Sequence, residues 1–170
     1  SKSYQVRELE DIYKEIDSLS SSYPQSRKVF LADGDALSLE TSYLLALLQY
    51  LKRSFVKLRR VSLYASAQNI LNKSSEELEL LFANGLNLIY YGVESGSDVV
   101  LKKITKGVNQ SEIIESLNKA SDAGIKISAT VILGIGGSKY SEVHIRDSAK
   151  IINETRVTYL STLQLSLEEE

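Results

Sequence analysis

The sequence predicts an α/β fold, a partial parallel (β/α) barrel with its helices on the outside. Short apolar segments alternate with longer amphipathic ones along the chain, an order that predicts strands joined by right-handed helical crossovers. Residues 88–93, Leu-Ile-Tyr-Tyr-Gly-Val, are continuously apolar, as in a strand that is covered on both faces. Polar or glycine-rich corners follow nearly every predicted strand, and this pattern favours a curled sheet over an open, doubly wound one.

The spacing of apolar residues and of turn residues predicts the elements in order. In the first half they are a helix over 4–19, a strand over 28–32, a helix over about 40–55, a strand over 60–66 and a helix from 74 that ends at Gly85. In the second half they are a strand from 88 to a corner at 92–96, a helix over 109–124, a strand over 125–133, a helix over about 140–153 and a strand over 157–165.

Several helix starts carry capping signals. Ser74 with Glu77, and Asn109 with Glu112, have the spacing of a capping box, in which a side chain and a backbone amide satisfy each other three residues apart. Ser38 is expected to cap the helix that begins near residue 40. These signals support a regular strand–helix repeat.

Composition limits the classes of partner. The chain has 170 residues, of which 43% are hydrophobic and 25% charged, as in one soluble globular domain spanning 1–170. Its net charge is −2, and it has no long basic or apolar run that would indicate a nucleic-acid or membrane partner. We therefore expect a cytoplasmic protein whose partners are a small-molecule cofactor and a substrate, and the oligomeric state stays open.

Cysteine and histidine are the next constraint. The chain has no cysteine, which excludes disulfides, zinc–thiolate sites and a thiolate-held iron–sulfur cluster within these residues. Its one histidine, His144, lies among Glu142, Arg146 and Asp147 on a predicted helix. We expect this histidine on the surface rather than in a site.

The first predicted helix has no strand before it. In a strand–helix repeat, the strand over 28–32 would then have a bare edge, which is liable to pair with other strands. We therefore expect that the domain is truncated at its amino end and lacks a first strand.

Polar residues follow the predicted strands and would face one common rim, where ligands bind in parallel α/β folds. Carboxylates, hydroxyls, amides and exposed backbone dominate this set, and cations are scarce. Such a rim suits a small molecule with amine and hydroxyl donors. The set comprises Asp33, Gly34, Asp35, Ser66, Gln68, Glu94, Ser95, Gly134, Gly136, Gly137 and Gln164.

Three of these corners lie in segments that resemble a known family. The run from Tyr91 to Gly107 is similar to the fourth-strand region of radical S-adenosylmethionine (SAM) enzymes, in particular iron–sulfur oxidoreductase-type members with a G-x-E-S-G corner. Residues 30–37 fall where that superfamily has a G-G-E segment, and 132–137 fall at its fifth-strand glycine motif. The resemblance covers essentially the whole chain and implies a TIM-like barrel, of which this chain holds five of six core strands.

The resemblance implies roles for individual positions. Asp33, Gly34 and Asp35 would hold the amino group of the methionine moiety of SAM. Glu94, with Ser66 nearby and Ser95 beside it, would serve the ribose and the methionyl part. The remaining implied contacts are the backbone at Ile135 and Gly136, which would pack on the adenine, and Gln164 on the last strand.

This sequence also departs from the family. Asp33 stands at the first glycine of the G-G-E segment and Asp35 at its acid, while Gly137 replaces a glutamate that often ends the fifth-strand motif. The three-cysteine loop that binds the 4Fe–4S cluster is absent. In the family that loop follows the first strand, the same piece that the bare edge indicates to be missing.

The implied function is that of a radical SAM enzyme in the complete protein, where a reduced 4Fe–4S cluster cleaves SAM to methionine and a 5′-deoxyadenosyl radical that abstracts a substrate hydrogen. Without cluster ligands, this chain alone is expected to be inactive. Two alternatives stay open. One is a non-catalytic (β/α) domain that binds a small molecule or acts as a scaffold; the other is a barrel enzyme that uses rim carboxylates with a divalent metal.

The rim residues have structural interpretations as well. Glu94 can be a strand-end residue beside a helix capped by Ser95 or Ser97. The two aspartates at 33 and 35 can be turn formers. The glycines at 134–137 lack the spacing and the following lysine of a phosphate-binding loop, and a strand-to-helix turn explains them equally well.

Overall fold

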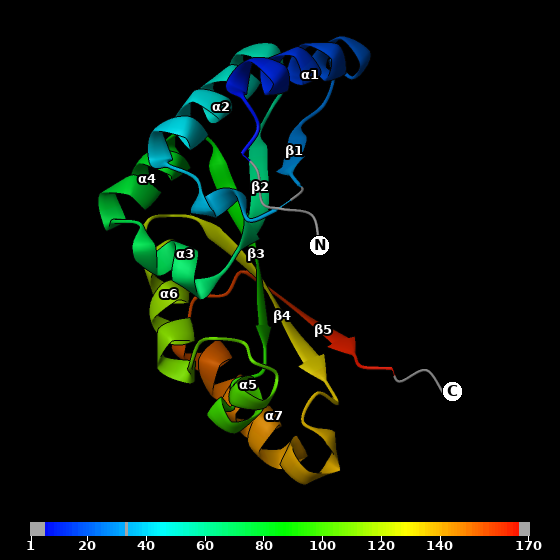
Figure 1. Ribbon diagram of the computed structural model, residues 1–170, viewed down its shortest axis with the longest axis vertical. Helices are drawn as coiled ribbons and strands as arrows, with labels where there is room; N and C mark the ends of the chain where they lie inside the picture. Colours follow the sequence, from blue (N-terminus) through cyan, green and yellow to red (C-terminus); the bar gives the residue numbers. More distant parts are fainter. Residues whose placement is uncertain (1–5, 33, 167–170) are drawn as a thin grey trace.

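A computed structural model describes residues 6–32 and 34–166. In that part of the chain five strands form one sheet in the order β1-β2-β3-β4-β5, and every neighbouring pair is parallel. Because each crossover turns in the same sense, the helices gather on one face of the sheet and the other face is bare of them (Figure 1). This is the predicted α/β partial parallel barrel, and a doubly wound sheet, with helices on both faces, is excluded.

The elements alternate as expected along the chain. The strands are β1 (Lys28–Leu31), β2 (Arg60–Ala65), β3 (Leu86–Glu94), β4 (Lys126–Leu133) and β5 (Tyr159–Gln164). The helices are α1 (Leu9–Ser22), the 3-10 turn η1 (Ala36–Ser38), α2 (Thr41–Ser54), α3 (Ala67–Asn72), α4 (Ser75–Ala83), α5 (Asp98–Lys103), α6 (Gln110–Asp122) and α7 (Gly137–Glu154). Among these described helices, none is long and apolar enough to cross a membrane.

The two capping boxes are confirmed. At the start of α4, Ser74 Oγ accepts from the Glu77 amide at 3.1 Å, and the Glu77 carboxylate accepts from the Ser74 amide at 2.7 Å. Asn109 and Glu112 make the same pair of bonds at the start of α6. These bonds satisfy amides that a helix start leaves without partners.

The expected cap at Ser38 is wrong. Ser38 ends η1, and its hydroxyl donates to the Asp35 carbonyl at 2.6 Å. The residue before α2 is Glu40, whose side chain makes no capping bond. The hydroxyl is used by the short 3-10 turn because that turn brings it back over the residue three positions earlier.

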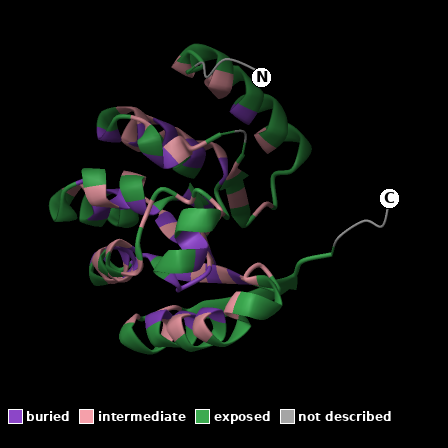
Figure 2. Cartoon of the chain, turned by 60° about the horizontal axis from the view of Figure 1, so that its bottom comes forward, coloured by how far each residue is buried: buried purple, intermediate pink, exposed green. Residues whose placement is uncertain are grey.

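The hydrophobic core lies between the helices and the sheet (Figure 2). On β3 the residues that face the helices, Ile89, Tyr91 and Val93, are buried, whereas Tyr90 and Gly92 between them are half-buried. The expectation that β3 is covered equally on both faces is therefore not met within the described residues. The continuous apolar run reflects two different environments, a helix-covered face and a concave, partly open one.

Aromatic rings line the concave face. Phe30, Tyr64 and Tyr90 come from three neighbouring strands and meet edge to face, with centroids 4.9 to 6.1 Å apart. Edge-to-face packing of this kind is favourable for aromatic rings. Tyr64 nevertheless keeps 60% of its surface exposed.

Both edge strands of the described sheet are open. Beside β1 lies a cavity of about 320 Å³, lined mainly by apolar side chains of α1, β1 and α2. At the other edge, every residue of β5 is exposed. The sheet therefore has the form of a barrel wall that does not close on itself.

Candidate functional site

The carboxyl end of β3 is built around an unusual backbone turn at Glu94. This residue has a φ of 60°, which is uncommon for a residue other than glycine, and the Ser95 amide donates to the Val93 carbonyl at 2.7 Å. A hydrogen bond between residues two apart, with the central residue at positive φ, is a γ-turn of the rare and strained kind. The strand therefore ends on a conformation that its surroundings must hold in place.

The turn aims the Glu94 side chain back over Gly92. A Cβ atom added to Gly92 would clash with the Glu94 carboxylate, so only glycine leaves room for it. Lys106 lies at the other side, with its Nζ 3.2 Å from Glu94 Oε1, and both side chains are about a quarter exposed. The carboxylate is thus half-buried, paired with one cation, and held at the end of the sheet where ligands bind.

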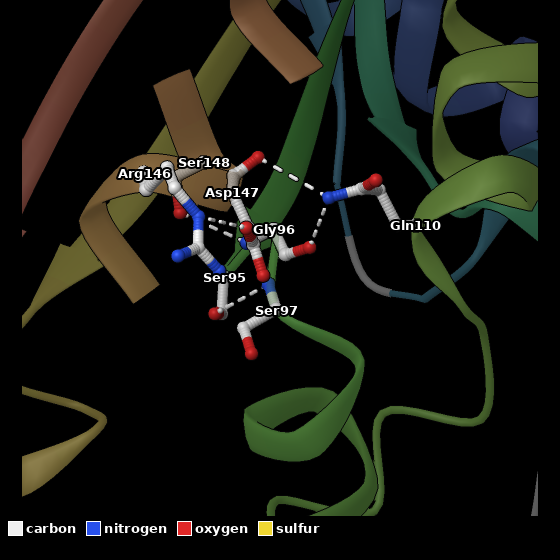
Figure 3. A network of polar contacts seen from close by, with 7 residues as sticks. All are labelled: Ser95, Gly96, Ser97, Gln110, Arg146, Asp147 and Ser148. Carbon is white, nitrogen blue, oxygen red and sulfur yellow. Dashed lines mark hydrogen bonds and ion pairs between the residues drawn. The ribbon is translucent and has the colours of Figure 1, made fainter. Parts of the chain in front are cut away.

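Beyond Glu94 the chain is buried between two helices. The Gly96 amide donates to Ser148 Oγ at 2.9 Å, and Gln110 Nε2 donates to the Gly96 carbonyl at 2.7 Å (Figure 3). A Cβ atom on Gly96 would clash with the backbone of α7 at Asp147. Glycine is required here because α7 passes directly against the main chain.

Ser95 is fully buried and faces α7. Its Oγ accepts from the Ser97 amide at 3.1 Å and lies 2.8 Å from His144 Nδ1. Ser97 directly precedes α5 but makes no side-chain capping bond. The structure therefore places the Ser95 hydroxyl inside the fold rather than at the open rim.

The expectation of a surface position for His144 is wrong, since only 2% of this residue is exposed. It lies on the inner stripe of α7 with Ser148 and Ile151, at i, i+4 and i+7. That spacing is the signal that could have located it. Glu142 and Arg146 are exposed on other sides of the helix, because residues two positions apart do not share a helix face, whereas Asp147, three positions further along, is half-buried.

Burial should make stability depend on the protonation of His144. Burial lowers the pKa of His144 below its ordinary value of 6.5, so the unfolded chain binds a proton more readily than the folded one. The free energy of unfolding should therefore fall as the pH decreases below about 6.5, by at most about 1.4 kcal/mol per pH unit from this one group. Urea unfolding of the wild type and of His144→Asn between pH 5 and 7 measures how the free energy of unfolding changes with pH. The same change in both proteins would contradict the expectation.

The corner after β1 is only partly described. Asp33 lies outside the described residues, and Gly34 is exposed. Asp35 is half-buried: Asn69 Nδ2 donates to its Oδ2, while its Oδ1 is buried and has no hydrogen-bond partner among the described residues. Burial raises the pKa of Asp35, and the Asn69 bond opposes that rise.

Asn69 joins the ends of β1 and β2. Its side chain binds Asp35, and its backbone amide donates to Ser66 Oγ at 3.3 Å, which caps α3. Asn69 was not expected from the sequence. The signal that could have located it is the serine that follows a strand, since Ser66 and Asn69 have the spacing of a helix N-cap and the residue whose amide it binds. The structure thus brings Asp35 and Ser66 together through a common partner.

The remaining rim positions are on β4 and β5. Gly134 to Gly137 form a tight turn, closed by a 2.9 Å bond from the Gly137 amide to the Gly134 carbonyl, and α7 starts at its end. Ile135 and Gly136 within it are half-buried. Gln164 is exposed at the end of β5, where it pairs with Leu133.

Comparison with known proteins gives the family. Residues 1–150 match the model of the radical SAM superfamily. A protein of Methanocaldococcus jannaschii described as a methylthiotransferase is 26% identical over 141 residues, which are 78% of this chain and 30% of that protein. The heme chaperone HemW of Bacillus subtilis is 27% identical over 115 residues, 67% of this chain and 30% of that protein. The chain therefore spans about a third of the length of these relatives.

Solved structures share the fold. Coproporphyrinogen III oxidase from Escherichia coli, a radical SAM enzyme, matches with a TM-score of 0.65 and 16% identity over 91% of this chain and 38% of that one. The methyltransferase TsrM from Kitasatospora setae matches with a TM-score of 0.68 and 17% identity over 93% of this chain and 31% of that one. With a family model that covers most of its length, the chain belongs to the radical SAM superfamily.

Proposed function

We propose that this chain forms the SAM-binding wall of a radical SAM enzyme. The observation that carries the proposal is the Glu94 carboxylate, which a strained turn holds over Gly92 at the carboxyl end of a central strand. Backbone strain that persists in a fold is concentrated at functional sites. Membership of the superfamily makes SAM the ligand to test first.

The donor and acceptor groups at the rim suit SAM. Asp35 offers a buried carboxylate oxygen that has no partner in the part of the chain that the structure describes, which fits an ammonium group such as that of the methionine moiety. Glu94 and the exposed Ser66 hydroxyl suit the ribose hydroxyls, and a carboxylate has acceptor sites enough to keep Lys106 as well. The turn at Ile135 and Gly136 presents backbone groups for the adenine edge. Gln164 stays a further candidate.

A 4Fe–4S cluster does not fit the residues of this chain. The sequence has no cysteine, and nowhere in residues 6–32 and 34–166 do three His, Cys, Asp or Glu side chains gather as metal ligands. We therefore assign no step of the reaction to residues of this chain. In the proposed complete enzyme, a cluster held by other residues supplies the electron that cleaves SAM, and this chain binds and orients SAM.

The open edge of β1 supports a further part of the proposal. An apolar cavity between α1, β1 and α2 adjoins the edge of β1 that pairs with no strand of the described sheet. We propose that a strand of the complete protein pairs there. Such a strand would complete the wall and would cover a sheet edge that proteins rarely leave open.

Titration calorimetry with SAM tests the proposed function. The wild-type chain should bind SAM, and Glu94→Gln should weaken binding at least tenfold, since a hydrogen bond to a charged group contributes about 1.5–3 kcal/mol. Glu115→Gln, an exposed position on α6, is the matched control and should bind as the wild type does. A folded wild-type chain that does not bind SAM would contradict the proposal and favour the scaffold alternative.

A further inference from the structure

Helix α7 is tied to the corner after β3 by two buried contacts. His144 Nδ1 lies 2.8 Å from Ser95 Oγ, and Ser148 Oγ accepts from the Gly96 amide at 2.9 Å. Gln110 of α6 adds a bridge, because its side-chain amide donates both to the Gly96 carbonyl and, at 3.4 Å, to the Asp147 carbonyl (Figure 3). These contacts join segments about 50 residues apart in the sequence.

The contact between Ser95 Oγ and His144 Nδ1 can run in either direction, according to the tautomer of the imidazole. Ser95 Oγ accepts one hydrogen bond from the Ser97 amide, which leaves it a second lone pair and its own proton. It can therefore donate to an unprotonated Nδ1 or accept from a protonated one. His144 Nε2 is buried and has no partner within the described part of the chain.

The contact adjoins the strained turn. Glu94 directly precedes Ser95, and the γ-turn bond is donated by the Ser95 amide itself. A strained turn persists only where its neighbours fix both sides of it. Here both neighbours of Glu94 are fixed. Val93, before it, is buried in the core, and Ser95, after it, is held against α7.

We propose that His144 is a positioning residue, which holds Ser95 and thereby keeps Glu94 in the conformation that directs its carboxylate over Gly92. This inference rests on the proposed function, since the carboxylate so placed is the one assigned to SAM. The same helix begins at the turn over 134–137, so α7 links the two strand ends to which ribose and adenine are assigned.

The test compares variants that fill the space of His144 with and without a hydrogen-bonding group. His144→Leu removes the partner of Ser95, whereas the side-chain amide of His144→Asn keeps a group near the position of Nδ1 that can donate or accept. Ile151→Val, on the same face of α7, is the control that loosens the packing of the helix without touching the corner. Each variant is titrated with SAM by calorimetry at a temperature where it is folded, and its Glu94 is observed by NMR.

The turn has its own signature, independent of SAM. At a φ near 60° the amide and α protons of Glu94 lie close together and give a strong intraresidue nuclear Overhauser effect, which weakens in an extended backbone. We expect His144→Leu to lose this signal and to weaken SAM binding at least tenfold. His144→Asn should recover most of both, and Ile151→Val should change neither.

Two results would overturn the inference. His144→Leu that keeps the Glu94 signal shows that the turn does not need the histidine, and Ile151→Val that loses it equally shows that general packing holds it. Ser95→Ala replaces His144→Leu if the latter does not fold, with the same expected losses. A wild type that shows the signal but does not bind SAM overturns the proposed function, while the NMR comparison still decides whether His144 holds the turn.

Discussion

Replacing Gly96 with alanine is expected to lower the free energy of unfolding by about 3 kcal/mol. The added Cβ would clash with the carbonyl group of Asp147 and the amide of Ser148, which are backbone atoms of α7 and cannot move aside by a rotamer change. Either the helix shifts away from the corner or the corner loses its γ-turn. Urea denaturation monitored by circular dichroism measures the loss.

A second glycine provides the control for this prediction. A Cβ on Gly136 would lie 3.1 Å from the Tyr140 carbonyl oxygen, a tight distance that a small shift relieves. Gly136→Ala should therefore lose less than about 1 kcal/mol. If Gly96→Ala is as stable as Gly136→Ala, helix α7 does not press on the corner as described.

Replacing Gly92 with alanine should have the opposite profile, with little loss of stability and a large loss of SAM binding. Here the clash is with the end of the Glu94 side chain, which can rotate away. The carboxylate would leave Lys106, and a partly exposed ion pair contributes only about 0–1 kcal/mol to stability. Calorimetry should show SAM binding weakened at least tenfold, or about 1.4 kcal/mol.

A double-mutant cycle isolates the cause. If Gly92→Ala acts by displacing the carboxylate, it should have little further effect on SAM binding in a Glu94→Ala background, so the two changes should be strongly non-additive. Full additivity would mean that the added methyl group obstructs the ligand directly. If Gly92→Ala binds SAM as tightly as the wild type does, Glu94 does not contact SAM from its observed position.

The order of the elements follows from local signals in the sequence. Apolar runs locate β1 to β5, and two capping boxes locate the starts of α4 and α6, because each of these features depends on residues close together in the chain. The short helix α3 is not among the predicted elements, and α5 enters only through the alternative interpretation of Ser95 or Ser97 as a helix cap. Each has only six residues, too few to repeat an apolar period clearly.

The site was predictable only in part, because its contacts are long-range. The sequence located Glu94 at a strand end, but it did not indicate the positive φ or the pairing with Lys106. His144 was assigned to the surface because the residues beside it in sequence are charged, whereas its actual partner, Ser95, is 49 residues away. Asn69, which holds Asp35, is 34 residues from it.

The two open edges of the described sheet have a consequence for the isolated chain in solution. They are different strands on opposite sides of the sheet, and β5, Tyr-Leu-Ser-Thr-Leu-Gln, has no charged residue that would repel another strand. A contact between β5 of one molecule and β1 of the next uses one edge of each and leaves the other two free. Self-association of this β5-to-β1 kind is heterologous, so it adds further copies in an open chain or a closed ring instead of ending at a symmetric dimer.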